Sequence, residues 1–239
     1  MEKGDDFLII NKPSGLTSHQ VVEKLRPLFP GKKVGHAGTL DPLAEGILII
    51  LIGAATKQQS HFMRLPKKYF FEITFGQERD TYDAEGRIVA QAGEEALKSL
   101  DFNRVKEALV PFQGLIKQKV PPFSAVKVKG KRLYELARKG KLDQVELPIK
   151  TVRIQRLELL RFYPWSEENL PRAELEMTCS YGTYVRSLAH DLGEKLGVGG
   201  YISRIIRTAV GDFSLNEAEK LEDLLARVKE SGVKSRSSS

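Results

Sequence analysis

The sequence predicts an α+β fold built around a mixed sheet with flanking helices. Strand-like and helix-like segments alternate irregularly along the 239 residues, through hairpin-like junctions and without the regular rhythm of a parallel α/β protein. Hydrophobic residues make up 41% of the chain and are spread over its whole length, which excludes wholesale disorder. A chain of this size buries about 70% of its unfolded surface, so it has no need of disulfides.

Local patterns predict the elements of the N-terminal half. Phe7 to Ile10 is a short strand, and Thr17 is a good N-cap for the amphipathic helix that follows. A glycine-rich loop covers residues 31–42. The apolar run from Gly46 to Gly53 is typical of a strand buried on both faces, and residues 68–76 alternate as a strand with one aromatic-rich face.

Local patterns also predict the elements of the C-terminal half, and the sequence shows no internal repeat. Its expected elements are a helix at Asp101–Val110, strands at Lys150–Phe162 and Arg172–Ser180, a helix at Tyr184–Leu196 closed by Gly197, and a last helix at Asn216–Lys229. We expect one domain over residues 1–230. Residues 231–239, rich in serine, are expected to be a disordered tail.

Several classes of protein are disfavoured. The longest apolar run, Gly46 to Ala55, is too short to cross a bilayer, and the N-terminus is too acidic for a signal peptide, so we expect a cytoplasmic protein without a membrane partner. Cys179 is the single cysteine and cannot form an internal disulfide. With only four scattered histidines the chain has no zinc-binding spacing, and we expect no metal.

Positive charge is concentrated in one segment. Residues 117–141 contain nine basic residues and a single acid, Glu135, so the net charge of this segment exceeds the +7 of the whole chain. Such a field attracts a polyanion, although a solvated lysine face has the same composition.

Three residues are candidates for chemistry. Asp41 lies in the glycine-rich loop just before a proline, where it is available as a nucleophile or base; the alternative is a structural Asx turn. Arg186 lies in the first turn of a helix, where a cation opposes the dipole unless something negative is near; the alternative is a solvated arginine. Tyr69 shares a face with Phe71, which is more typical of a core.

These residues fall within five motifs that occur in the order typical of one family. The motifs are Asn11-Lys12-Pro13-Ser14-Gly15-Leu16-Thr17-Ser18, Gly35-His36-Ala37-Gly38-Thr39-Leu40-Asp41-Pro42-Leu43-Ala44-Glu45-Gly46, Lys67-Lys68-Tyr69, Gly76-Gln77-Glu78-Arg79-Asp80-Thr81-Tyr82-Asp83, and Gly182-Thr183-Tyr184-Val185-Arg186. Together they resemble the TruB family of tRNA pseudouridine synthases over about residues 7–226. The resemblance implies the pseudouridine synthase fold, with a mainly antiparallel mixed sheet.

The resemblance also implies an activity. A uridine in the T-loop of tRNA, at position 55, becomes pseudouridine: the bond from N1 to C1′ breaks, the uracil rotates, and C5 bonds to C1′ and loses its proton. The reaction needs no redox cofactor. The target base must leave the stack to be reached.

Roles for individual residues follow from the same resemblance. Asp41 is expected to be the catalytic carboxylate, by attack on the sugar or the base or by removal of a sugar proton, and Arg186 to pair with it. Tyr69 stacks on the target base and helps to remove the C5 proton. His36 occupies the space that the flipped nucleotide leaves. Candidates for positioning or RNA contact are Lys12, Lys57, Asp80 and Tyr184.

Two departures from the family pattern are visible. Ile206 replaces one of two adjacent arginines, and we expect no appended C-terminal RNA-binding domain. A stand-alone, monomeric bacterial-type enzyme fits best. The alternatives are an RNA-binding or RNA-folding module without turnover, and the catalytic subunit of a guide-RNA particle.

Overall fold

The computed structural model describes residues 7–234, without the side chains of residue 143 and residues 229–234. It divides into two compact units. Of the described residues, the first unit combines residues 7–69 with residues 205–234, and the second consists of residues 70–204. Two long strands, β4 (Lys67–Phe75) and β12 (Gly200–Val210), pass from one unit into the other.

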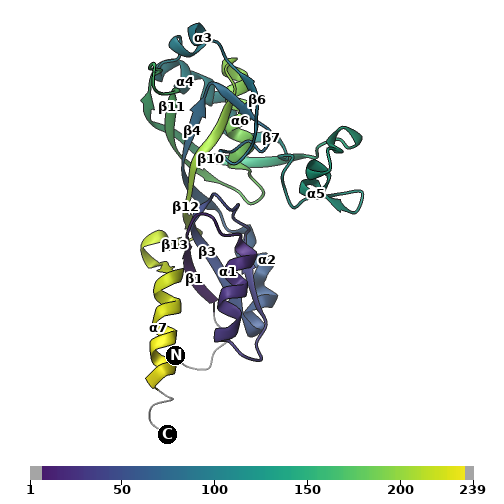
Figure 1. Ribbon diagram of the computed structural model, residues 1–239, viewed down its shortest axis with the longest axis vertical. Helices are drawn as coiled ribbons and strands as arrows, with labels where there is room; N and C mark the ends of the chain where they lie inside the picture. Colours follow the sequence, from purple (N-terminus) through teal and green to yellow (C-terminus); the bar gives the residue numbers. More distant parts are fainter. Residues whose placement is uncertain (1–6, 235–239) are drawn as a thin grey trace. The chain divides into compact units, whose positions relative to one another are not determined.

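A sheet in the order β14-β1-β3-β12 forms the centre of the first unit, with β2 beside β3 and β13 beside β12. Figure 1 shows α7 on one side of these strands and α1 and α2 on the other. The remaining elements of this unit are β1 (Phe7–Lys12), β2 (Val34–Ala37), β3 (Glu45–Ile52), β13 (Phe213–Ser214), β14 (Glu219–Lys220), α1 (Ser18–Leu25), α2 (Gln59–Arg64) and α7 (Leu221–Lys234).

The core of the first unit forms around β3, whose residues from Gly46 to Ile52 are all buried. Ile47, Ile49 and Leu51 pack with Phe62 of α2 on one face. Because the alternate residues of β3 are also buried, the prediction of a strand covered on both faces is confirmed.

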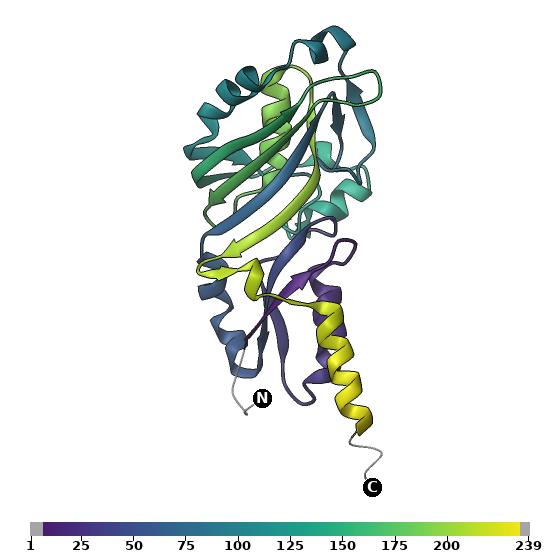
Figure 2. The same ribbon diagram turned by 90° about the vertical axis from the view of Figure 1, so that its left-hand side faces the viewer.

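In the second unit the sheet order is β12-β4-β11-β10-β7, and α4 and α6 pack against it. Figure 2 shows α6 behind these strands. The unit further contains β5 (Gln77–Arg79), β6 (Ile88–Gln91), β7 (Gly114–Lys119), β8 (Lys127–Val128), β9 (Lys131–Arg132), β10 (Ile149–Tyr163), β11 (Arg172–Cys179), α3 (Glu94–Lys98), α4 (Phe102–Leu109), α5 (Leu133–Arg138) and α6 (Val185–Leu196).

Most pairings are antiparallel, including β1 with β3 and β10 with β7 and β11, whereas β12 runs parallel to β3. This mixed sheet with helices confirms the α+β prediction. Among the described residues no helix is long and apolar enough to span a membrane.

Three local predictions need correction. The loop expected at 31–42 contains strand β2, because Val34–Ala37 pairs with β3. The last helix starts at Leu221, since Glu219 and Lys220 pair with β1 as β14. That helix runs to Lys234, so residues 231–234 are helical, and the rest of the expected tail, 235–239, lies outside the described residues.

Candidate active site

Asp41 lies in the connection between β2 and β3, at residues 38–44 of the first unit. The two strands pair from Val34 opposite Ile52 to Ala37 opposite Ile49, so the connection begins and ends at a fixed hairpin. The side chain of Asp41 is half-buried, and its carbonyl accepts a hydrogen bond from the Ala44 N–H at 3.1 Å. The loop is therefore locally turned rather than extended.

The segment from Lys12 to Ser18 holds this loop from one side. Ser18 Oγ accepts from the Leu40 N–H at 2.8 Å and donates to the Leu40 carbonyl at 3.1 Å. The Gly15 N–H donates to the Pro42 carbonyl at 2.9 Å. Ser18 and Leu40 are buried, so the two bonds between them are shielded from water, whereas Gly15 is exposed. Together the three bonds fix the backbone on both sides of Asp41.

Lys12 is fully buried, which sequence reasoning did not indicate. Its Nζ donates to the carbonyls of Pro13 at 2.8 Å, Leu16 at 2.6 Å and Pro42 at 3.2 Å. A buried ammonium has to be hydrogen-bonded, and here its donors are directed at carbonyl groups of the site itself. Of the two roles expected for Lys12, the geometry favours positioning over contact with RNA.

His36 lies on β2, next to the loop. Burial lowers the pKa of His36 below 6.5, and the charges of Arg207 and His19 lower it further. The ring is therefore neutral at pH 7. Its Nδ1 is buried and has no hydrogen-bond partner within the part of the chain that the structure describes.

Two other candidates of the first unit differ in exposure. Lys57 lies in a 3-10 turn at Gly53–Gln58 and is exposed, which suits contact with a ligand in solution. Tyr69 is half-buried on β4 and points to the same face as Phe71, whose side chain is fully buried. The strand thus fixes the backbone of Tyr69 while part of its ring stays accessible.

Arg186, in the second unit, is the second residue of α6 and is 5% exposed, so it is not a solvated surface arginine. Its Nη1 donates to the Thr81 carbonyl at 2.8 Å and its Nη2 to the Phe123 carbonyl at 3.0 Å. Nε lies 3.6 Å from Oδ2 of Asp83. These partners fix the plane of the guanidinium.

Asp83 is a negative group near Arg186 within this unit, and sequence reasoning did not single it out. It is 5% exposed and accepts hydrogen bonds from Thr81 Oγ1 at 2.5 Å and the Glu85 N–H at 3.2 Å. The signal was present, because Asp83 ends one of the quoted motifs. Asp80, which the motifs did indicate, accepts two hydrogen bonds from Arg87 in the same loop.

Tyr184 precedes α6 and is held by Gln118, a buried residue of β7. The Gln118 side chain accepts from the Tyr184 N–H at 2.8 Å and donates to the Tyr184 carbonyl at 2.9 Å. The helix has no side-chain N-cap, but this pair of bonds gives the N–H of its N-cap residue, Tyr184, a partner. Lys150 Nζ lies 5.4 Å from the centre of the Tyr184 ring.

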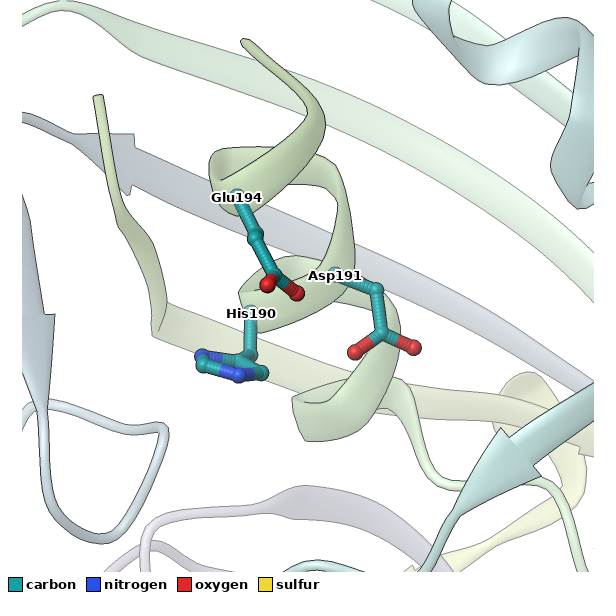
Figure 3. A group of neighbouring side chains, drawn as sticks. All are labelled: His190, Asp191 and Glu194. Atoms are coloured by element: carbon teal, nitrogen blue, oxygen red, sulfur yellow. The ribbon is translucent and has the colours of Figure 1, made fainter. Parts of the chain in front are cut away.

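A group of polar side chains on α6, at His190, Asp191 and Glu194, could be considered for a cation. Figure 3 shows the Glu194 carboxylate between the other two, and the ligand atoms lie within 4.8 Å of one another. However, His190 stacks on the Tyr82 ring at 3.9 Å, and its Nδ1 lies 3.6 Å from Glu78. We assign no metal to this group.

The same group changes two pKa values. Burial, with added repulsion from Asp191, Glu78 and Glu194, raises the pKa of Tyr82 to about 12. Burial also raises the pKa of Asp191. Both shifts come from burial beside like charges and do not need a ligand to explain them.

Comparison with known proteins agrees with these motifs. Residues 26–185 match the family model described as TruB family pseudouridylate synthase (N terminal domain), and residues 186–236 match the one described as tRNA pseudouridylate synthase B C-terminal domain. The second match overlaps the C-terminal part of the domain expected at residues 1–230 and continues to residue 236, within the expected tail, so the domain boundaries stay a prediction.

Similar curated proteins are named tRNA pseudouridine synthase B. The relative from Aquifex aeolicus is 46% identical over 222 residues, which cover 93% of this chain and 74% of the relative. The relative from Mycobacterium bovis (strain BCG / Pasteur 1173P2) is 42% identical over 224 residues, with coverage of 94% and 73%.

Solved structures show the same fold. A chain in the crystal structure of a Cbf5-Nop10-Gar1 complex superimposes with a TM-score of 0.68 at 25% identity, covering 92% of this chain and 53% of its own length. A chain in the structure of an H/ACA RNP bound to a substrate RNA gives a TM-score of 0.66 at 23% identity, with coverage of 95% and 55%. With family models matched along most of the sequence, the chain belongs to the TruB family of pseudouridylate synthases.

Proposed function

We propose that this chain isomerises a uridine in the T-loop of tRNA to pseudouridine, with Asp41 as the catalytic carboxylate. The observation that carries the proposal is the hydrogen-bonded frame around the Asp41 loop. Lys12, Gly15 and Ser18 all donate to main-chain carbonyls of residues 40–42. A frame of this kind holds a reacting side chain in one geometry. The choice of reaction rests on membership of the TruB family of pseudouridylate synthases.

The proposed reaction is an isomerisation, so the product contains the same atoms as the substrate and only protons exchange with water. The bond from N1 to C1′ breaks, the uracil rotates, C5 bonds to C1′, and C5 loses a proton while N1 gains one. Asp41 acts by attack on the sugar or base or by removing a sugar proton. Tyr69 stacks on the base and helps to remove the C5 proton, and neutral His36 fills the space of the flipped nucleotide.

Asp41→Asn tests the catalytic role, because the amide keeps the shape of the side chain and loses its charge. We expect the rate of tritium release from tRNA labelled at uridine C5 to fall at least about a thousandfold. Binding of tRNA should survive. Asp212→Asn is the matched control, since Asp212 is an exposed carboxylate of the same unit. A rate within tenfold of wild type would leave Asp41 as a structural turn residue.

Tyr69→Phe keeps the stacking surface and removes the hydroxyl. We expect tRNA affinity to be unchanged and tritium release to be lost. Tyr163→Phe is the control, because the Tyr163 hydroxyl donates to Glu174 at 3.1 Å. These two residues lie on β10 and β11, whereas Tyr69 lies on β4. Normal turnover in Tyr69→Phe would remove the proton-transfer role and leave stacking.

Pairing of Arg186 with Asp41 is also part of the proposal. A double-mutant cycle with Asp41→Asn and Arg186→Lys measures it. If the two residues act as one unit, the double variant should be no slower than Asp41→Asn alone. Additive losses would mean that Arg186 acts separately.

The target and the independence of the enzyme are tested with the purified chain and a bare tRNA transcript. We expect turnover without any protein or guide RNA, and none when cytidine replaces the T-loop uridine. Turnover that needs added partners would instead favour a catalytic subunit of a particle. Binding without turnover would favour an RNA-folding module. Light scattering of the same preparation tests the expected monomer.

For phosphate contacts we propose the basic segment 117–141. All nine of its basic residues are exposed. Lys127 and Lys131 lie on the β8–β9 hairpin, whose turn at Lys129 and Gly130 has positive φ at both residues. Figure 1 shows α5 and this hairpin standing away from α3 and α4.

Replacing Lys127, Lys129 and Lys131 together by Ala should flatten the plot of log affinity against log salt. Removing one phosphate-bound cation lowers the slope by about 0.7 to 0.9, so the total change for three is up to about two to three units. Turnover at saturating tRNA should change much less. The control removes three exposed lysines elsewhere in the same unit, Lys98, Lys106 and Lys195. Equal slopes in the two triple variants would place the RNA elsewhere.

A further inference from the structure

Arg207 is a buried cation whose donors are directed at the Asp41 loop. It lies on β12 in the first unit and is 1% exposed. A guanidinium that is shielded from water is stable only with partners for its N–H groups. Its Nε donates to the Ile47 carbonyl at 2.7 Å, its Nη2 to the Gly38 carbonyl at 2.9 Å, and its Nη1 approaches the Thr39 carbonyl at 3.4 Å.

These three carbonyls flank the loop that carries Asp41. Gly38 and Thr39 begin the loop, and Ile47 belongs to β3 just beyond its end. A single planar side chain therefore joins the two ends of the loop. The main chain of Arg207 also pairs with Gly46 in the parallel β3–β12 ladder, so the guanidinium starts from a fixed backbone position.

Lys12 complements this arrangement, because its Nζ donates to the Pro42 carbonyl on the other side of Asp41 in the sequence. The loop is thus bonded to one buried cation before Asp41 and to another after it. Both cations donate to neutral carbonyls of the main chain. Neither is exposed enough to meet a phosphate.

We propose that Arg207 is a positioning residue for the reaction: its planar fork holds residues 38–47 in the conformation that presents Asp41 to the substrate. The inference rests on the proposed catalytic role of Asp41. A guanidinium is suited to this task, because its donors form a rigid fork, whereas an ammonium is a point charge with three rotating donors. Misplacement of a reacting group by about 1 Å can cost about a hundredfold in rate.

The test compares Arg207→Lys and Arg207→Met with wild type. The measurements are the single-turnover rate of tritium release at saturating tRNA, tRNA affinity, the thermal midpoint, and hydrogen exchange of the amides in residues 38–44. We expect the rate to fall about a hundredfold in Arg207→Met, and less in Arg207→Lys. Exchange should rise in residues 38–44, and tRNA affinity should be unchanged.

Phe62→Leu is the control for a merely structural role. Phe62 is buried in the first unit and packs on β3 from α2, so the variant loses stability without touching the loop carbonyls. Each rate is compared at a temperature well below the thermal midpoint. An Arg207 variant that is no slower than Phe62→Leu would overturn the proposal. If Arg207→Met does not fold, Arg207→Lys alone decides by the same comparison.

A last measurement separates this inference from the proposed function. Adding Arg207→Lys to Asp41→Asn should cause no further loss of rate, because the loop then has no carboxylate to position. If Asp41→Asn itself keeps its rate, the proposed function fails. If Asp41→Asn is inactive while the Arg207 variants turn over normally, the positioning role alone is wrong.

Discussion

Gly46→Ala should disrupt the parallel pairing between β3 and β12, in which Gly46 lies opposite Arg207. Gly46 has φ of +99°, a backbone conformation that residues with a Cβ rarely adopt. A Cβ there would lie 2.3 Å from the carbonyl oxygen and 2.9 Å from the nitrogen of Arg207. Both atoms belong to the main chain of a paired strand, so neither can move without breaking the ladder.

The expected cost combines two effects. Strained backbone costs about 1 to 3 kcal/mol, and overpacking of a filled site costs about 1 to 3 kcal/mol more. Because a chain of this size loses about 2 to 4 °C of thermal midpoint per kcal/mol, the midpoint should fall by at least about 5 °C. Thermal unfolding followed by circular dichroism measures the change.

Gly35→Ala is the matched control for this variant. Gly35 lies on β2 without positive φ, and a Cβ there would have Thr56 Cγ2 at 3.9 Å as its nearest neighbour, which is ordinary contact. Its midpoint should stay near that of wild type. If Gly46→Ala and Gly35→Ala unfold at the same temperature, the expected clash between a Cβ at position 46 and the main chain of Arg207 is refuted.

Three further outcomes are expected. The unfolding free energy of the wild type should fall as the pH drops below 6.5, because the unfolded chain protonates His36 before the folded one does; His36→Gln should remove that part of the slope in urea titrations from pH 7.5 to 5. Gln118→Met should cost about 1 to 3 kcal/mol in the same assay, since it leaves the N–H and carbonyl of Tyr184 without the amide. Arg186→Lys should strongly lower the single-turnover rate and change the thermal midpoint little, because an ammonium cannot reproduce the planar contacts of the guanidinium with the Thr81 and Phe123 carbonyls.

Elements set by local signals were predictable. The helix after Thr17 begins with the capping box that Thr17 and Gln20 form. Helix α6 ends at Gly197, whose φ of +76° is the left-handed cap expected of glycine there. In both places the deciding contacts lie within a few residues of the chain, so the sequence contains the whole signal.

Elements set by distant partners were not predictable. Strand β12 interrupts its apolar pattern with Arg204 and Arg207, and it is a strand because β3 and β4 both pair with it. The last helix begins later than its sequence pattern predicts, because the capping box of Ser214 and Glu217 starts only a 3-10 turn. Pairing of β14 with β1 then keeps the chain extended until Leu221.

For the site, the family motifs indicated Asp41, Arg186 and Lys12, but not Arg207 or the contact between Asp83 and Arg186. Asp83 is bonded inside its own loop and to Arg186, across about a hundred residues of chain. Lys12 and Arg207 donate to main-chain carbonyls. Every residue has such a carbonyl, so the sequence does not indicate which ones accept these hydrogen bonds. Sequence patterns mark the reacting side chains, and only the fold shows which main-chain groups orient them.

Two classes of basic residue in this chain therefore differ in burial and in expected role. Lys12, Arg186 and Arg207 are at most 5% exposed and donate to carbonyl groups, where salt does not screen them. The cations of segment 117–141 are exposed, and salt competes directly with any phosphate that they meet. Raising the salt concentration should weaken tRNA affinity through the exposed class. The single-turnover rate at saturating tRNA should depend on the buried class and stay constant across the same range of salt.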